Sequence, residues 1–242
     1  MLEQDSVKKS EEPCAGAIIV AAGQSIRMEG LDKIWAPLLG LPLISHSVQV
    51  FDDSPLISSI VLVMPSHNID QGHYLVNAHR WTKVVDICAG GERRQDSVRH
   101  GLDSILDTRW VMVHDGARPC IDGQMISMGL QKVMETGAAV PAVPIKDTVK
   151  SVGRDMKVNH TVCRDRLWAT QTPQVFHTNL LKKAHQMISK DVTDDASMVE
   201  AIGGEISIYH GSYDNIKVTT PKDIAIAEAI VRSRSLRRQC NG

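Results

Sequence analysis

Apolar runs alternate with amphipathic segments along most of the chain. Six runs rich in β-branched and apolar residues predict strands: Ala17–Ala21, Ile60–Met64, Val84–Cys88, Trp110–Val113, Ala138–Val143 and Ile206–Tyr209. Six segments between or after them carry apolar residues at helical spacing: Ser45–Phe51, Arg94–Leu106, Gln124–Thr136, Asn179–Ser189, Asp194–Ile202 and Lys222–Val231. This alternation predicts an α/β fold, a Rossmann-like three-layer α/β/α arrangement around a mostly parallel, twisted sheet.

One segment departs from the alternation. Residues 147–152 and 156–161 are polar, strand-like runs on either side of the turn Gly153-Arg154-Asp155, which predicts a β-hairpin. A two-stranded arm of this kind, about residues 146–166, has too few apolar residues for a core of its own. We therefore expect it to protrude and to pack against the same arm of a second copy, giving a homodimer.

Length and composition indicate one soluble domain. The chain has 242 residues, 43% of them hydrophobic and 23% charged, with a formal net charge of -1. Residues 14–232 are expected to form a single domain, and residues 1–13 and 233–242 are expected to be disordered tails. The near-neutral charge gives no bulk attraction to nucleic acid or to a membrane surface, and we expect neither as a partner.

The termini and the cysteines favour a cytoplasmic location. The first residues are polar and mixed in charge, unlike a signal peptide, and no apolar run reaches the length of about 18 residues that spans a bilayer. The five cysteines show neither CxxC spacing nor paired histidines. They are read as reduced thiols and not as a zinc site.

The most informative loop follows the first predicted strand. The strand runs into the small-residue turn Ala21-Ala22-Gly23, and Arg27 and Lys33 come behind it. The bare backbone can approach a polyanion, and the two cations can neutralise it, so the loop is read as a triphosphate-binding loop. It has neither the Walker spacing nor the three-glycine dinucleotide fingerprint. The alternative is an ordinary strand-to-loop connection with two surface cations.

A second loop follows Val84–Cys88. It begins with Gly90-Gly91 and opens a helix that carries Ser97 in its first turn. The glycines would let a base or ribose approach the backbone, and the Ser97 hydroxyl could bond to a pyrimidine edge. The alternative is a helix cap formed by Asp96 or Ser97.

Asp115 stands just beyond the buried strand Trp110–Val113. Ligands of open parallel sheets bind beyond the carboxyl ends of the strands, so the loops after Val20, Cys88 and Val113 should converge. A carboxylate there could hold a magnesium ion against phosphate oxygens. A turn-forming or capping aspartate is the structural alternative.

Three further polar clusters lie downstream, at residues 147–148, at 163–168 with 171–174, and at 214–219. Within them Arg164 and Lys217 could hold a second phosphate, because a guanidinium binds phosphate bidentately and an ammonium acts as a point charge. Each could instead be a surface salt-bridge partner.

Six motifs, taken together, resemble one enzyme family. They are Ala-Ala-Gly-x-x-x-Arg-Met at 21–28, Gly-Gly-x-x-Arg-x-x-Ser-Val at 90–98, Val-His-Asp-x-Ala-Arg-Pro at 113–119, Asp-Thr-Val-Lys at 147–150, Thr-Pro-Gln at 172–174 and Asp-Asn-Ile-Lys-Val-Thr at 214–219. They closely resemble the 2-C-methyl-D-erythritol 4-phosphate cytidylyltransferases, in order and over about residues 15–231.

The resemblance implies a homodimeric, magnesium-dependent enzyme of the non-mevalonate isoprenoid pathway, in which other divalent cations could serve. It would convert CTP and methylerythritol phosphate to diphosphocytidyl-methylerythritol and pyrophosphate. By motif position, the implied catalytic residues are Arg27, Lys33, Arg164 and Lys217. The implied CTP contacts are Ala21, Ala22, Gly23, Gly91, Ser97 and Asp115. The second substrate is implied to contact Asp115, Arg118, Thr148, Arg164, Thr172 and Lys217, with Asp115 as the metal ligand.

The chain departs from the family pattern at two positions. Lys33 stands in Leu-Asp-Lys-Ile-Trp where the family usually has Pro-Lys-Gln, and Glu92 follows the double glycine where aspartate is frequent. Two alternatives stay open. One is a ribitol-5-phosphate cytidylyltransferase, which shares the fold and CTP; the other is a non-catalytic nucleotide-binding dimer that kept the fold.

Overall fold

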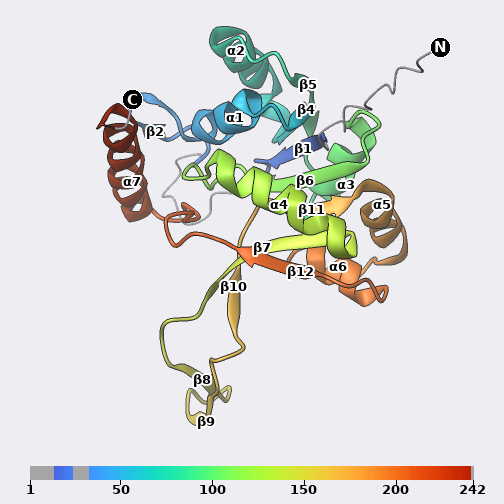
Figure 1. Ribbon diagram of the computed structural model, residues 1–242, viewed down its shortest axis with the longest axis vertical. Coiled ribbons are helices and arrows are strands. Elements are labelled where there is room, and N and C mark those ends of the chain that lie inside the picture. Colours follow the sequence, from blue (N-terminus) through green and yellow to red (C-terminus); the bar gives the residue numbers. More distant parts are fainter. Residues whose placement is uncertain (1–13, 24–32, 241–242) are drawn as a thin grey trace, which may run out of the picture.

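The computed structural model describes residues 14–23 and 33–240. The predicted phosphate-loop residue Arg27 lies outside these described residues. A central twisted sheet is covered by helices on both faces, and a narrow arm projects from one end of the body (Figure 1). The three-layer α/β/α prediction is therefore confirmed.

Eight strands form the central sheet in the described part of the chain. Seven follow the order β10-β7-β11-β6-β1-β4-β5, and β12 pairs with β7. Their bounds are β1 Ala15–Val20, β4 Ile57–Met64, β5 Val84–Ala89, β6 Trp110–Asp115, β7 Ala138–Pro144, β10 Trp168–Thr170, β11 Gln174–His177 and β12 Ser207–His210. The short strands β2, Pro37–Leu38, and β3, Leu41–Pro42, pair separately.

The sheet is mostly parallel. Strand β1 runs parallel to β4 and to β6, β4 runs parallel to β5, and β12 runs parallel to β7. Strands β10 and β11 are antiparallel to the strands they pair with. The six predicted strands all occur, whereas β10 and β11 were not predicted. The strand order reverses at β1, which places the crevice for a ligand between the ends of β1 and β6.

The helices divide between the two faces of the sheet. Their bounds are α1 Leu43–Asp53, α2 Ile69–His79, α3 Arg94–Ser104, α4 Gly123–Thr136, α5 Thr178–Met187, α6 Asp195–Ala201 and α7 Pro221–Cys240, with a 3₁₀ turn at Ser66–Asn68. Apolar residues of α1, α2 and α4 form one core with one side of the sheet. Residues of α3, α5 and α6 form a second core with the other side. Successive side chains of a strand point to opposite faces of the sheet, so in β1 Ile19 packs in the first core and its neighbour Ile18 packs in the second.

The C-terminal segment differs from the prediction. Residues 233–242 were expected to be a disordered tail, but α7 continues through Cys240. Its Ala227 packs into a third core beside Leu38, Leu43 and Val218, and Arg234 donates to the carbonyl oxygen of Cys120 at 2.5 Å. These contacts hold the helix against the body, and the arginines beyond Val231 do not interrupt it. None of the described helices combines the length and apolarity needed to cross a membrane.

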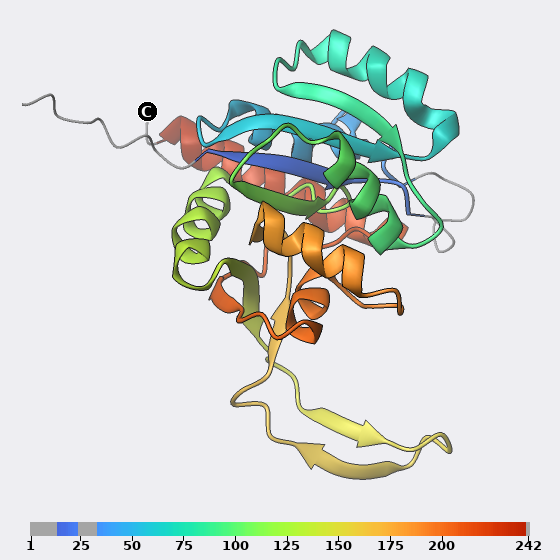
Figure 2. The ribbon, with the colours of Figure 1, turned by 90° about the vertical axis from the view of Figure 1, so that its right-hand side faces the viewer.

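The predicted hairpin is confirmed. Strands β8, Val149–Val152, and β9, Val158–Val162, form a separate antiparallel sheet that extends well away from the body (Figure 2). The chain leaves the main sheet after β7 and returns in β10, which pairs with it from Pro144 opposite Trp168. Most arm residues are exposed, including Val152, Met156 and Val158. The arm thus carries apolar surface that its own chain leaves uncovered.

Candidate active site

A cavity of about 310 Å³ opens at the carboxyl ends of β1, β5 and β6. The loops expected to converge there do so. The residues around the cavity are Val20, Ala21, Ala22, Gly23, Lys33, Ile34, Gly91, Glu92, Arg93, Arg94, Ser97, Asp115, Ala117 and Lys217. It is the point where the strand order reverses, and it is lined by small residues together with several charged side chains.

Most residues predicted to bind the nucleotide meet at this cavity. The six predicted CTP contacts line it, as do the predicted catalytic residues Lys33 and Lys217. Four predicted substrate residues do not line it: Arg118, Thr148, Arg164 and Thr172. The first and last of these lie directly behind Asp115, and the other two belong to the arm.

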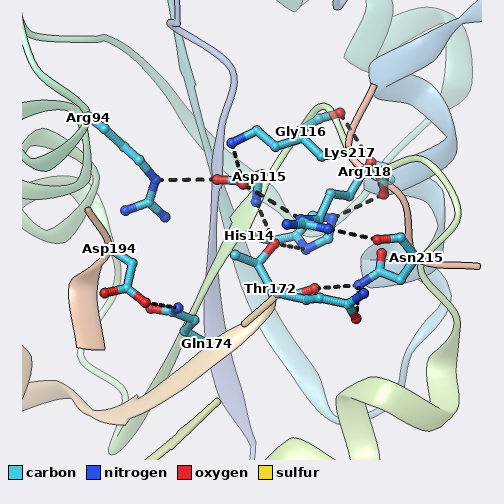
Figure 3. A network of polar contacts seen from close by, with 12 residues as sticks. Arg94, His114, Asp115, Gly116, Arg118, Thr172, Gln174, Asp194, Asn215 and Lys217 are labelled. Atoms are coloured by element: carbon cyan, nitrogen blue, oxygen red, sulfur yellow. Dashed lines mark hydrogen bonds and ion pairs between the residues drawn. The ribbon is translucent and has the colours of Figure 1, made fainter. Parts of the chain in front are cut away.

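Asp115 is the centre of a charged cluster (Figure 3). Its side chain accepts from Lys217 Nζ at 2.8 Å and from Arg94 Nε at 3.3 Å, and Arg118 Nε lies 3.6 Å from Oδ2. Burial alone would raise the pKa of Asp115, but Arg94 and Lys217 hold it far below its usual range. Asp115 is therefore a fixed anion that orients Arg94 and Lys217 at the cavity and Arg118 behind it.

Arg94 is the arginine of the Gly-Gly-x-x-Arg motif, to which the sequence assigned no role. In the structure Arg94 is the first residue of α3, and its side chain lines the cavity. The guanidinium bridges two carboxylates, because Nη1 lies 2.6 Å from Asp195 Oδ2 and Nε donates to Asp115. Burial lowers the pKa of Arg94, and Asp195 and Asp115 raise it by more. The only sign of this role in the sequence was the position of the arginine in the motif. Its two partners lie 21 and 101 residues away, so the sequence did not indicate the contacts.

Thr172 supports Asp115 from behind. The Asp115 backbone N–H donates to Thr172 Oγ1 at 3.0 Å, and that hydroxyl lies 3.0 Å from His114 Nδ1. The other ring nitrogen, Nε2, lies 3.3 Å from the Arg118 carbonyl oxygen, which assigns its proton to that contact. Burial lowers the pKa of His114 to about 3, so the ring is neutral at physiological pH. This chain of hydrogen bonds fixes the end of β6.

Asn215 anchors the loop that carries Lys217. It is fully buried, its amide donates to the Thr172 carbonyl oxygen at 2.9 Å, and its own backbone carbonyl accepts from Arg118 Nη1 at 2.7 Å. Burial lowers the pKa of Arg118, although the nearby Asp115 opposes that effect. The Asp-Asn-Ile-Lys motif is thus explained by one residue that locks the loop and another that reaches the cavity.

The double glycine is required by packing within the chain. A Cβ on Gly90 would lie 2.1 Å from the Ala22 Cβ, and one on Gly91 would lie 2.4 Å from the Asp96 Cβ. The Ser97 hydroxyl accepts from the Gly91 N–H at 3.1 Å, and Asp96 accepts from the Arg93 N–H at 3.3 Å. The helix-cap alternative therefore accounts for Asp96, while Ser97 both closes the loop and lines the cavity.

Thr148 and Arg164 lie on the arm, away from the cavity of their own chain. Both are exposed, and the Arg164 guanidinium donates to the carbonyl oxygen of Lys146 at the root of the arm. Lys146 in turn lies over the ring of Tyr213 at 3.3 Å, and the Tyr213 hydroxyl donates to the Pro144 carbonyl oxygen. The arm is consequently fixed to the body at its base, with Arg164 turned to solvent.

Two acidic residues, Asp115 and Glu92, line the cavity and could contact a metal ion. Among the described residues, no cluster of three or more His, Cys, Asp or Glu side chains is arranged to hold a metal ion. Asp115 is ionised and faces the cavity, and Glu92 is the other acidic residue there. A cation in this cavity would have to share its coordination with a ligand.

Comparisons with known proteins point to one enzyme family. The family model described as IspD, 2-C-methyl-D-erythritol 4-phosphate cytidylyltransferase, matches residues 15–233. A protein of that name from Dehalococcoides mccartyi is 46% identical over 217 residues, covering 90% of this chain and 96% of that protein. One from Alkaliphilus oremlandii is 40% identical over 223 residues, covering 90% and 94%.

Solved structures show the same fold. The 4-diphosphocytidyl-2C-methyl-D-erythritol synthase from Anaerococcus prevotii superposes with a TM-score of 0.81 at 27% identity, covering 92% of this chain and all of that one. The 2-C-methyl-D-erythritol 4-phosphate cytidylyltransferase from Thermus thermophilus gives a TM-score of 0.74 at 27% identity, covering 89% and 98%.

Proposed function

This chain belongs to the 2-C-methyl-D-erythritol 4-phosphate cytidylyltransferase family, and from that premise we propose which of its residues perform the reaction. The enzyme transfers CMP from CTP to 2-C-methyl-D-erythritol 4-phosphate in non-mevalonate isoprenoid precursor synthesis. The products are 4-diphosphocytidyl-2-C-methyl-D-erythritol and pyrophosphate.

The chemistry requires charge stabilisation more than proton transfer. An oxygen of the methylerythritol phosphate attacks the α-phosphorus of CTP, and the bond from that phosphorus to the pyrophosphate oxygen breaks. The attacking phosphate is largely ionised at neutral pH, since its second pKa is about 6, so no general base is needed. The protein must bring two polyanions together and stabilise the charge that develops between them. A cavity lined by cations and one fixed anion suits that chemistry.

The nucleotide half of the site is assigned to the first two loops. The backbone of Ala21-Ala22-Gly23 offers N–H groups to the triphosphate, and Lys33, which lines the same cavity, supplies positive charge. Arg27 has the matching role by its position in the motif. Gly91 and Ser97 also line the cavity, where they would contact the cytidine.

The second half of the site is assigned to Lys217 and Arg118 together with two arm residues. Lys217 reaches the cavity while its side chain stays 39% exposed, so it can exchange its contact with Asp115 for a substrate phosphate. Thr148 and Arg164 are exposed, do not line their own chain's cavity, and belong to the arm, which projects from the body (Figure 1). We assign them to the cavity of a second copy, in a homodimer formed through the arm.

Magnesium is the proposed cofactor. Mg²⁺ in nucleotide sites is held by one or two carboxylates plus substrate phosphates, and Asp115 provides one ionised carboxylate in the cavity. The donor set fits on that basis, and other divalent cations could replace magnesium. When bound, the ion would neutralise triphosphate charge; the cations around Asp115 do the same from the protein side.

The observation that carries the proposal is the position of Asp115, between the triphosphate loop and Lys217, at the point of strand reversal. A pyrophosphate-release assay with CTP and each polyol phosphate tests it. We expect turnover with methylerythritol phosphate; turnover with ribitol phosphate alone would contradict the assignment. Equilibrium sedimentation at micromolar concentration tests the assembly, and a compact monomer there would contradict the arm-mediated homodimer.

A further inference from the structure

A buried carboxylate stands behind the cavity and is not explained by the assigned roles. Asp195 is the first residue of α6, is 0% exposed, and does not line the cavity. Its Oδ2 lies 2.6 Å from Arg94 Nη1, which is shorter than the 3.3 Å contact between Arg94 Nε and Asp115 Oδ1. The guanidinium is therefore fixed more closely to Asp195 than to the active-site acid.

The surroundings of Asp195 make Arg94 its main support. Among the residues that the structure describes, the other oxygen, Oδ1, has no hydrogen-bond partner, and His185 Nε2 lies 3.6 Å from it, beyond hydrogen-bond distance. A buried charge is costly unless it is paired. Burial raises the pKa of Asp195, but Arg94, with a smaller contribution from His185, holds it below its usual range, so the group is an anion. The pair thus consists of two mutually dependent charges, of which only Arg94 reaches the cavity.

Asp195 is not the residue that caps α6. The preceding residue, Asp194, caps the helix, because its side chain accepts from the Ser197 N–H at 3.0 Å. It also accepts from Gln174 Nε2 at 2.8 Å (Figure 3). The two neighbouring aspartates therefore have separate roles. One caps the helix and ties it to β11, and the other faces Arg94.

We propose that Asp195 is a positioning residue for nucleotide binding, which holds Arg94 at the wall of the cavity so that its guanidinium meets the triphosphate of CTP. Asp115 cannot do this alone, because Lys217 and Arg118 also contact it and the proposed metal ion would draw on the same carboxylate. Asp195 keeps the guanidinium in place whichever partner Asp115 takes. The inference rests on the proposed assignment of this cavity to CTP.

The test is CTP binding to the full-length protein with magnesium, measured by titration calorimetry, together with the KM values for both substrates. Asp195→Asn keeps the shape and removes the charge. We expect it to weaken CTP binding by roughly tenfold or more, as for loss of a charge-assisted hydrogen bond, with the KM for methylerythritol phosphate changed by less than about twofold. Asp194→Asn is the matched control: it should lower the melting temperature and leave the CTP Kd unchanged.

A double variant separates positioning from folding. If Asp195 acts through Arg94, Arg94→Gln/Asp195→Asn should bind CTP as Arg94→Gln does, because nothing remains to be positioned. The double variant also removes both buried charges together, so it remains informative if Asp195→Asn alone does not fold. The inference would be overturned if the double variant lost CTP affinity by the product of the two single losses. It would also be overturned if a folded Asp195→Asn protein bound CTP with wild-type affinity. Failure of the wild-type protein to bind CTP would instead count against the proposed function.

Discussion

Lys217 Nζ lies 2.8 Å from Asp115 Oδ2, although the two residues are 102 positions apart in the chain. The contact brings the end of β6 and the loop before α7 to the same side of the cavity. It also means that the lysine expected to hold the second substrate begins in an ion pair. In the proposed reaction, substrate phosphate would compete with Asp115 for this cation.

Removing either cation of the nucleotide loop should abolish most turnover without unfolding the protein. We expect Lys33→Ala and Arg27→Ala each to lower kcat/KM by about a hundredfold or more, because each removes charge stabilisation from the triphosphate. Lys182→Ala is the control, since Lys182 is an exposed residue of α5. Turnover near the wild-type value in both variants, measured by pyrophosphate release, would refute the assignment.

Mixing two inactive variants should restore activity if the arm serves a partner. Arg164→Ala damages the arm, and Lys217→Ala damages the cavity, so a mixed dimer contains one intact site built from the two undamaged halves. Random exchange of subunits should then give about a quarter of wild-type turnover. If both residues served the same chain's cavity, the mixture would stay as inactive as the separate variants.

As the pH is lowered, the protein should begin to lose stability at a higher pH than protonation of its carboxylates alone would cause. The pKa of buried His114 is lowered to about 3, below the value of about 6.5 in an unfolded chain. Between these values the unfolded chain binds a proton that the folded chain does not. The free energy of unfolding should therefore fall as the pH is lowered below about 6.5, by up to about 1.4 kcal/mol per pH unit.

Urea unfolding between pH 7.5 and 5.5 measures this slope. His114→Gln should reduce it, because the titrating group is gone. Replacement of the exposed arm residue His160 by glutamine should leave it in place. A wild-type stability that does not change over this range would contradict the assignment of His114 as a buried neutral ring.

The Thr172 hydroxyl should contribute to stability and turnover, although Thr172 does not line the cavity. Thr172→Val keeps the shape but leaves the buried Asp115 N–H without its acceptor, which should cost about 1–3 kcal/mol of unfolding free energy. Thr172→Ser retains the acceptor and should lose much less. Turnover should follow the same order, since Asp115 depends on this contact for its position. Equal stability of the two variants would show that the hydroxyl is not needed.

A methyl group at Gly90 should disturb the nucleotide loop. The new Cβ would lie 2.1 Å from the Ala22 Cβ and 2.9 Å from Ser97 Oγ, and Ala22 cannot move aside without its backbone. We expect Gly90→Ala to cost about 1–3 kcal/mol and to weaken CTP binding. Gly123→Ala, where no atom lies within 4 Å of the new Cβ, is the control and should be nearly neutral. CTP affinity and melting temperature that match the wild type in Gly90→Ala would contradict this packing.

The parts of the fold that sequence reasoning recovered are those with strong local patterns. Strands β1, β4 and β6 are almost continuously apolar because helices cover both faces of the sheet. The arm was recognisable from two polar, strand-like runs on either side of the turn Gly153-Arg154-Asp155. The elements that were missed have weak patterns: only Gly72 and Leu75 of α2 are buried, and β11 is the short segment Gln174–His177.

The sequence predicted the site residues that belong to recognisable motifs. Lys33, Ser97, Asp115 and Lys217 meet at one cavity, as expected from the convergence of strand ends. Thr172 was placed with the substrate, whereas it is 4% exposed and bonds to the Asp115 backbone. No local pattern distinguishes a hydroxyl that faces a ligand from one that faces a strand end. The same holds for Arg94, whose two carboxylate partners become visible only in three dimensions.

The ring of contacts around Asp115 has a consequence for how the enzyme matures. Its partners come from α3, from the segment after β6, from the segment between β10 and β11, and from the loop before α7. No short contiguous fragment of the chain contains them all, and early packing of β1 and β4 does not require any of them. Catalytic competence should therefore return last during refolding, after secondary structure and most of the hydrophobic burial. Turnover then reports completion of the native topology more stringently than any spectroscopic measure of its parts.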